Sequence, residues 1–173
     1  VLVELATQLV PPLVEAYTLL AGISGVMSPA IAHEIAAQLT ALPGLQSTRI
    51  ATDLHPLLYA HVPDTPGILV IAGTGASILV HDGQQNFRRF GGRGPIMGDD
   101  GSAYQIAVAA LRAIARAQDD VAPETALARA ITEALQLPDA EALVTWSLSA
   151  TKQAIAALTT TVALVAEGGD TVA

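Results

Sequence analysis

The sequence predicts an α/β fold, because segments typical of strands and of helices are interleaved along its length. Three strand-like segments follow one another closely between residues 67 and 90, separated by glycine-containing turns. Helical patterns come before this group, and the sequence beyond Pro123 is helical in character. Mixed elements in this order are typical of an α/β or α+β architecture.

The first 62 residues are expected to place helices around short strands. In order, the expected elements are a helix over residues 1–20 that breaks or starts at Pro11-Pro12, a strand over 19–26, a helix from Ser28-Pro29 to about Leu42, a strand over 48–52 and a short helix over 54–61. Ser28 is the candidate N-cap of the second helix, because its hydroxyl can accept a hydrogen bond from the first turn.

The centre of the chain is expected to form a three-stranded meander followed by helices. Residues 67–72 have the pattern of a buried strand, and Asp82-Gly83 is a hairpin-turn signal. The expected elements are strands over 67–72, 77–81 and 86–90, a loop over 91–95, a helix capped by Ser102 that runs to about Ala117, and helices over 124–137 and 139–166.

Charge and composition exclude several classes of function. The formal net charge is -8 and the isoelectric point is about 4.7, which argues against a nucleic-acid or anionic-membrane surface. The chain has no Cys, so thiolate catalysis and Cys-ligated metals are excluded for these residues. No signal peptide and no membrane-spanning apolar run are visible. These features fit a cytoplasmic protein.

Gly73-Thr74-Gly75 is the first candidate binding motif. A strand that ends in Gly-x-Gly and doubles back can present backbone N–H groups to a phosphate, and Thr74 adds a hydroxyl donor. An ordinary β-hairpin turn explains the same tripeptide, and taken alone it is the commoner explanation.

Asp53 is the second candidate, at the end of a short apolar strand. A carboxylate there can accept the proton of a substrate hydroxyl that attacks phosphorus. The competing interpretation is an N-cap for the helix that begins at Leu54, and in isolation it is favoured.

Residues 91–102 form the third candidate, a glycine-rich loop that contains the acidic pair Asp99-Asp100. Adjacent carboxylates can bond sugar hydroxyls or hold magnesium through water, but acidic residues are also favourable at a helix N-terminus. The four histidines have no metal-ligand spacing, so no metal-binding residue is assigned. His81, at a strand end beside a turn, is expected to be exposed, and Trp146 to pack against a helix.

Together these motifs resemble the BadF/BadG/BcrA/BcrD ATPase family, and within it the N-acetylglucosamine kinases. The resemblance rests on Thr52-Asp53, on I-L-V-I-A-G-T-G-A-S and on G-G-R-G-P-I-M-G-D-D-G-S-A-Y-Q-I, in that order. It implies two ribonuclease-H-like lobes of the actin/hexokinase/Hsp70 type. Residues 1–62 would be the C-terminal part of the first lobe, and residues 63–173 the start of the second, with its meander (67–90), sugar loop (91–102) and helices (102–173).

The resemblance also implies a role for each motif in ATP-dependent, Mg²⁺-requiring phosphorylation of an aminosugar. Asp53 would be the base that takes the proton from the sugar's 6-hydroxyl. The residues that would bind ligand are Gly73, Thr74 and Gly75 for phosphate, and Ser77, Gly92, Arg93, Gly94 and Asp99 for the sugar. ATP and a small aminosugar would be the partners, without nucleic acid or membrane, and a homodimer is a possible assembly.

The sequence departs from the family's common pattern at several positions. Ala76 stands in place of a Ser, Arg93 in place of a Trp, and Asp100 in place of a Glu, and Leu54-His55 follow Asp53 where small residues are usual. Arg93 cannot supply a flat apolar wall, which leaves the sugar preference open. A non-catalytic sugar- or nucleotide-binding relative is therefore an alternative.

A second alternative is a BadF-type ATPase activator, but such proteins hold an iron–sulfur cluster with cysteines, and this chain has none. The family's first phosphate loop, a D-G-G-G-T-like hairpin, and its later adenosine element are also missing from the sequence. The chain is therefore expected to be a piece of a longer kinase and to be inactive when expressed alone.

Overall fold

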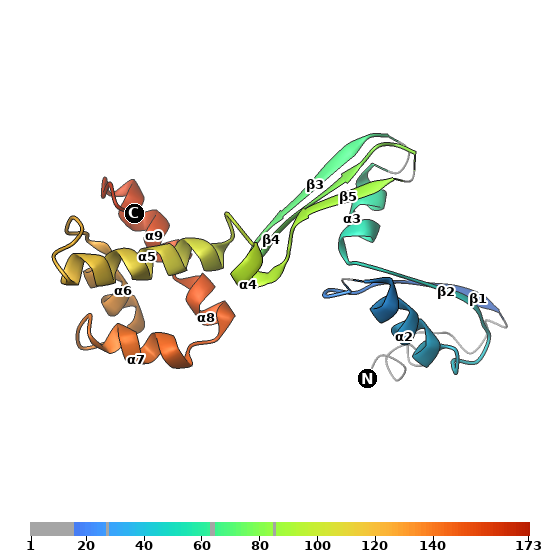
Figure 1. The fold of residues 1–173 in the computed structure, drawn as a ribbon, viewed down its shortest axis with the longest axis horizontal. Helices are drawn as coiled ribbons and strands as arrows, with labels where there is room; N and C mark the ends of the chain where they lie inside the picture. The colour runs from blue at the N-terminus through green and yellow to red at the C-terminus, as the bar shows by residue number, and fades with distance from the viewer. Residues whose placement is uncertain (1–15, 27, 63–64, 85) are drawn as a thin grey trace. The chain divides into compact units, whose positions relative to one another are not determined.

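The computed structural model describes residues 16–26, 28–62, 65–84 and 86–173, and it divides into two compact units (Figure 1). The first unit contains the described residues up to Leu69 together with Leu79–Arg88. The second contains Val70–Ile78 and Arg89–Ala173. Strands and helices are mixed along the chain, which confirms the expected α/β class. The lobe boundary between residues 62 and 63 stays a prediction.

Two parallel strands and two helices form most of the first unit. Strand β1 (Tyr17–Gly22) pairs with β2 (Leu45–Ala51), and helix α2 (Pro29–Leu39) connects them. Gly22 lies opposite Ala51, so both strands end at the same edge of the sheet. Helix α3 (Leu54–His61) follows directly after this edge.

The expected helix over residues 1–20 is wrong for its last four residues, which belong to β1. The parallel pairing with β2 supplies their backbone hydrogen bonds, and that partner lies almost 30 residues further along the chain. Residues 1–15 and the break at Pro11-Pro12 lie outside the described residues. The cap of α2 is confirmed, since Ser28 Oγ accepts a hydrogen bond from Ile31 N at 3.4 Å.

Three consecutive strands form the second sheet, in the order β3 (Gly67–Ala72), β4 (Ala76–His81) and β5 (Phe87–Gly91). This order confirms the expected meander. The turn after β4 is built as predicted, with Gly83 at φ +81° and Asp82 Oδ1 accepting a hydrogen bond from Gln84 N at 2.7 Å.

Two burial expectations for this sheet are wrong. Ile68 and Val70 of β3 are exposed, because nothing described in the chain covers that face of the strand. His81 is only 2% exposed, because its ring stacks on Phe87 with a centroid separation of 4.6 Å. The burial of His81 depends on Phe87 of the next strand, and the local sequence around His81 does not reveal that contact.

The second unit has a helical core. Its helices are α4 (Gly94–Met97), α5 (Ala103–Gln118), α6 (Leu127–Leu135), α7 (Ala142–Ser149), α8 (Lys152–Ala157) and α9 (Thr159–Glu167). Leu127 and Ile131 of α6 are fully buried in this core against side chains of α5 and α9, and Trp146 packs against it as expected. The N-cap of α5 is also confirmed, since Gln105 N donates to Ser102 Oγ at 3.2 Å.

The single helix expected over residues 139–166 is instead three helices. Ala150 is extended (φ −69°, ψ 139°), and Thr151 caps α8 by accepting a hydrogen bond from Ala154 N at 3.1 Å. Leu158, which is buried, separates α8 from α9. Packing onto the core therefore divides a continuous helical pattern. No helix among the described residues is long and apolar enough to cross a membrane.

Candidate functional site

Asp53 lies between β2 and α3 in the first unit, at the edge where the two parallel strands end. Its backbone has helical angles (φ −55°, ψ −23°), and its side chain makes no capping hydrogen bond. Capping of α3 therefore does not account for this carboxylate. The edge beyond the carboxyl ends of parallel strands is where ligands of α/β proteins bind.

Gly22 lets the start of α3 approach the end of β1 closely. A Cβ on Gly22 would lie 2.7 Å from Pro56 Cγ and 3.3 Å from Asp53 Cα. Any larger residue would push the Asp53 segment away from the strand. The sequence analysis did not single out Gly22, and the signal available was a glycine at the end of an apolar strand.

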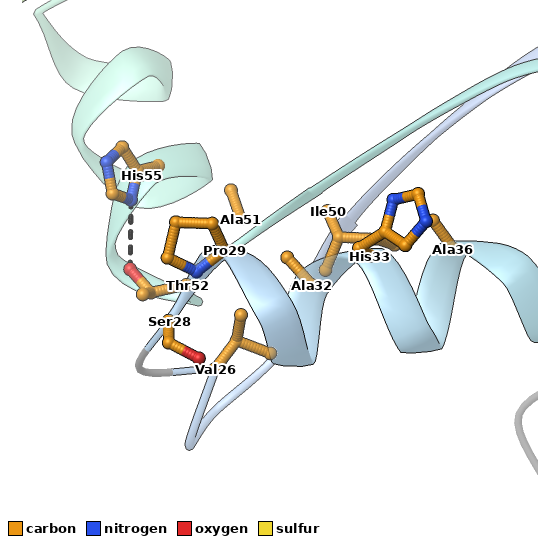
Figure 2. Close-up of a pocket in the computed structure, with 10 residues that line it drawn as sticks. All are labelled: Val26, Ser28, Pro29, Ala32, His33, Ala36, Ile50, Ala51, Thr52 and His55. Carbon is orange, nitrogen blue, oxygen red and sulfur yellow. Dashed lines mark hydrogen bonds between the residues drawn. The ribbon is translucent and has the colours of Figure 1, made fainter.

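A cavity of about 540 Å³ lies between α2 and the end of β2, next to the Asp53 segment (Figure 2). Thr52 and His55, the neighbours of Asp53, contribute to its wall, and Thr52 Oγ1 and His55 Nδ1 are 2.9 Å apart. The lining residues are Val26, Ser28, Pro29, Ala32, His33, Ala36, Ile50, Ala51, Thr52 and His55. The wall is mostly apolar with a few polar groups, as is common for small-molecule sites.

The turn Gly73-Thr74-Gly75 joins β3 to β4 and belongs to the second unit. Gly73 N donates to Gly75 O at 2.9 Å, and Ala103 N, at the start of α5, donates to Gly73 O at 2.9 Å. The turn is therefore fixed to the first residue of α5. Apart from its two chain neighbours, no described residue has an atom within 4 Å of the place a Gly73 Cβ would take, so a ligand can approach this backbone.

Asp99 lies against this turn, although the two are 24 residues apart in sequence. Its carboxylate Oδ2 is 3.0 Å from the position that a Cβ on Gly75 would occupy. The residue is buried and has left-handed backbone angles (φ +64°), which non-glycine residues seldom adopt. Lys152 Nζ is 2.8 Å from Oδ2 and forms an ion pair with it.

The predicted sugar loop packs closely on β4. Gly92 N donates to Ala76 O at 2.9 Å, and a Cβ on Gly92 would lie 2.6 Å from Ser77 Oγ. Gly92 and Gly94 both have positive φ (+62° and +82°), so the loop uses backbone conformations that favour glycine. Arg93, between them, is exposed.

The structure thus brings together two groups of predicted residues within the second unit. The turn 73–75 contacts Asp99, and Ser77 contacts Gly92. Asp53 belongs to the first unit. Within the described part of the chain, no three His, Asp or Glu side chains gather in a way that could hold a metal ion.

Residues 13–173 match the BadF/BadG/BcrA/BcrD ATPase family over nearly the whole chain. The chain belongs to this family. Two curated relatives carry kinase names. The N-acetyl-D-glucosamine kinase of Dictyostelium discoideum is 41% identical over 81 residues, which cover 47% of this chain and 25% of that protein. The N-acetylmuramic acid/N-acetylglucosamine kinase of Clostridium acetobutylicum is 32% identical over 112 residues, which cover 64% of this chain and 37% of that protein.

Solved structures agree with this membership. A protein assigned as an N-acetylglucosamine kinase from Chromobacterium violaceum matches with a TM-score of 0.72 at 26% identity, over 89% of this chain and 53% of that one. A protein with the same assignment from Porphyromonas gingivalis matches with a TM-score of 0.54 at 21% identity, over 83% of this chain and 49% of that one. This second match shows that the fold is shared. The matches span between a quarter and about half of the length of these relatives.

The sequence did not indicate a role for two residues that contact the candidate site, Lys152 and Gln105. Lys152 is the ion-pair partner of Asp99, 53 residues away. Gln105 Nε2 donates to Pro95 O at 2.5 Å and to Gly98 O at 3.3 Å, and so holds the glycine-rich loop against α5. A polar residue in the first turns of a helix that follows a long loop was the available signal for Gln105, whereas nothing local marked Lys152.

Proposed function

We propose that the whole protein containing this chain transfers the γ-phosphoryl group of ATP to a hydroxyl of an aminosugar of the N-acetylglucosamine type. The observation that carries the proposal is the open Gly73-Thr74-Gly75 turn, fixed to α5 and placed against a charge-compensated carboxylate. Accessible backbone groups at a glycine turn are suited to phosphate. The kinase names of both curated relatives support the same reaction.

Asp53 is proposed to be the general base. In the reaction, the sugar oxygen forms a bond to the γ-phosphorus, the bond from that phosphorus to the ADP oxygen breaks, and the hydroxyl proton passes to the Asp53 carboxylate. Orientation of the hydroxyl contributes as much as basicity in such transfers. The position of Asp53 after two parallel strands, with no capping bond on its side chain, supports this role.

The sugar contacts are proposed to come from the second unit. Ser77, Gly92, Arg93, Gly94 and Asp99 are the residues assigned to them. The close packing of Gly92 on Ser77 supports a loop of defined shape, since Gly92 N also donates a hydrogen bond to Ala76 O of the same strand. Arg93 offers a cation where the family commonly has an aromatic ring, so a sugar with an acidic substituent is a substrate to compare with N-acetylglucosamine.

Magnesium is proposed to arrive with the nucleotide, since Mg²⁺ in kinases is held by phosphate oxygens and one or two carboxylates. When bound, it would neutralise charge on the transferred phosphoryl group. Asp100, which is exposed beside the turn-contacting Asp99, is the carboxylate on this loop that is open to solvent.

We also propose a cytoplasmic location, in keeping with the absence of cysteine from the sequence.

The test is Asp53→Asn in the whole protein, with ADP release measured in the presence of N-acetylglucosamine and binding of AMP-PNP measured by calorimetry. We expect kcat to fall by about 10²–10⁴-fold, the range for loss of a general base, while the AMP-PNP Kd changes by less than about threefold. Asp119→Asn is the matched control, because it replaces an exposed carboxylate at the end of α5. Unchanged turnover in Asp53→Asn would remove the base assignment. A wild-type protein that binds sugar but never phosphorylates it would indicate a non-catalytic relative.

A further inference from the structure

Lys152 is the single lysine of the 173-residue sequence, and its ammonium group forms the ion pair with Asp99. The other seven of its eight Lys and Arg residues are arginines. The Asp99 side chain is 5% exposed and the Lys152 side chain 35%. A carboxylate this deeply buried is unfavourable unless an opposite charge compensates it. Lys152 supplies that charge.

The position of Lys152 is unfavourable for its own helix. It is the first residue of α8, directly after the N-cap Thr151. Cations are disfavoured at helix N-termini, where the backbone N–H groups carry partial positive charge. Helix stability therefore does not explain a lysine here, whereas the ion pair with Asp99 does. The Tyr104 ring of α5, whose centroid is 5.6 Å from Lys152 Nζ, holds the ammonium group from a second side.

The compensated carboxylate is packed on the glycine turn. Asp99 Oδ2 and Cγ would lie 3.0 Å and 3.4 Å from a Cβ on Gly75, so only hydrogen separates this carboxylate from the turn backbone. Gly73 O is bonded to Ala103 N on the other side of the turn. Without the lysine, a buried negative charge would lie directly beside the turn, where it would repel another anion.

We propose that Lys152 is a positioning residue for the phosphates of the nucleotide. It holds the Asp99 carboxylate against Gly75 and cancels its charge, so that an anionic phosphate can approach residues 73–75. The inference rests on the proposed function, because it takes that turn as the phosphate site. Lys152 would then act on nucleotide binding through Asp99, without touching the substrate itself.

The test compares nucleotide and sugar binding in variants of the whole protein. Lys152→Met keeps an apolar stem of similar length but removes the charge, Lys152→Arg keeps the charge, and Lys152→Met with Asp99→Asn removes both charges. Arg129→Met is the matched control, since it removes an exposed cation that pairs with Glu133 on the same helix. Calorimetry with AMP-PNP and with uncharged N-acetylglucosamine gives the two affinities, and circular dichroism checks the fold of each variant.

We expect Lys152→Met to weaken AMP-PNP binding at least tenfold and sugar binding by a clearly smaller factor, which arises only through the loosened Asp99. Lys152→Arg should remain within about threefold of wild type for both ligands. The double variant should recover most of the AMP-PNP affinity, because the repelling charge is gone, although its sugar affinity should fall with the loss of Asp99. Arg129→Met should change neither affinity.

A purely structural role for the pair would weaken the binding of both ligands by similar factors, and AMP-PNP binding would not recover in the double variant. That result, or AMP-PNP binding by Lys152→Met at the wild-type level, would overturn the inference and leave the proposed function intact. A wild-type protein that binds no nucleotide would instead refute the proposed function, and the role of Lys152 with it.

The ion pair itself can be tested in the whole protein. Spectra of ¹⁵N-lysine-labelled wild type and Lys152→Arg identify the Lys152 side-chain ammonium signal, and an ion-paired ammonium group exchanges slowly with water. We expect the signal to be visible in the wild-type protein and to be lost or shifted in Asp99→Asn. A signal that is identical in the two proteins would show that Lys152 does not pair with Asp99 and would overturn the inference.

Discussion

At the scale of single residues, Gly92 and Gly94 belong to the same loop but differ in the space around them. Both have positive φ, but a Cβ on Gly92 would collide with Ser77 Oγ at 2.6 Å, whereas no described residue beyond the chain neighbours lies within 4 Å of a Cβ on Gly94. Replacement of Gly94 by alanine therefore incurs conformational strain alone. Replacement of Gly92 incurs strain and displaces β4 or the loop.

This pair gives a matched prediction. We expect Gly94→Ala to lower the free energy of unfolding by about 1–2 kcal/mol, the cost of a left-handed non-glycine residue. Gly92→Ala should cost more than Gly94→Ala and should raise the sugar KM of the whole protein. Chemical denaturation and sugar-dependent kinetics measure the two effects. Equal losses for both variants would mean that the contact with Ser77 does not restrain the loop.

Single residues also show which parts of the candidate site the sequence could suggest and which it could not. Asp53, the turn 73–75 and the loop through Asp99 were proposed from the sequence, because their order along the chain resembles a family, and their roles stay predictions. Gly22 and Lys152 were not, because their importance comes from contacts with Pro56 and Asp99 that lie 34 and 53 residues away. A residue whose role depends on a distant partner has no local signature.

At the scale of elements, helix α6 contributes two fully buried side chains, Leu127 and Ile131, to the helical core. Leu127 is 0% exposed and packs against the residues of α5 and α9, whereas Leu148 of α7 is 85% exposed. The two leucines therefore form an internal comparison of buried and exposed sites in neighbouring helices.

We expect Leu127→Ala to lower the free energy of unfolding by about 2–5 kcal/mol, since it leaves a cavity in a closed core. Leu148→Ala should change it by less than about 0.5 kcal/mol. Urea denaturation followed by circular dichroism measures both. A loss for Leu127→Ala no larger than that for Leu148→Ala would contradict the packing of α6 in this core.

The ends of elements were harder to predict than their presence. The expected helix over residues 124–137 is observed as Leu127–Leu135, and its first turn is held by Asp170. Asp170 accepts hydrogen bonds from Thr125 Oγ1 and Ala126 N, at 2.9 and 2.7 Å. The start of α6 therefore depends on a side chain 44 residues away as well as on the local hydrogen bond from Leu127 N to Thr125 Oγ1.

At the scale of the whole chain, Asp170 makes stability depend on pH. The hydrogen bond from Ala126 N, followed by that from Val172 N, lowers the pKa of Asp170 from its usual value of 3.8 to about 2. Because the folded-state pKa is the lower one, the bonds to the carboxylate stabilise the fold fully above about pH 4. Their contribution is lost as the pH falls from 4 towards 2.

We therefore expect Asp170→Asn to lower the Tm at pH 6 and to differ less from wild type at pH 2.5, where the native carboxyl is partly protonated. Asp119→Asn, which replaces an exposed carboxylate at the end of α5, should show no such convergence. Scanning calorimetry at the two pH values, with NMR titration of the Asp170 carboxyl carbon, measures the effect. A Tm difference that stays constant with pH would contradict the role of the charged form.

By itself, the sequence determined the α/β class, the meander over residues 67–90, the caps at Ser28 and Ser102 and the motifs that place the chain in its family. These features depend on local periodicity, on turn chemistry and on motif order. The tertiary structure alone decided that the first strand begins at Tyr17, that His81 is buried and that Lys152 compensates Asp99. Each of these depends on a partner distant in sequence, and pairing, stacking and charge compensation arise only when folding brings the partners together.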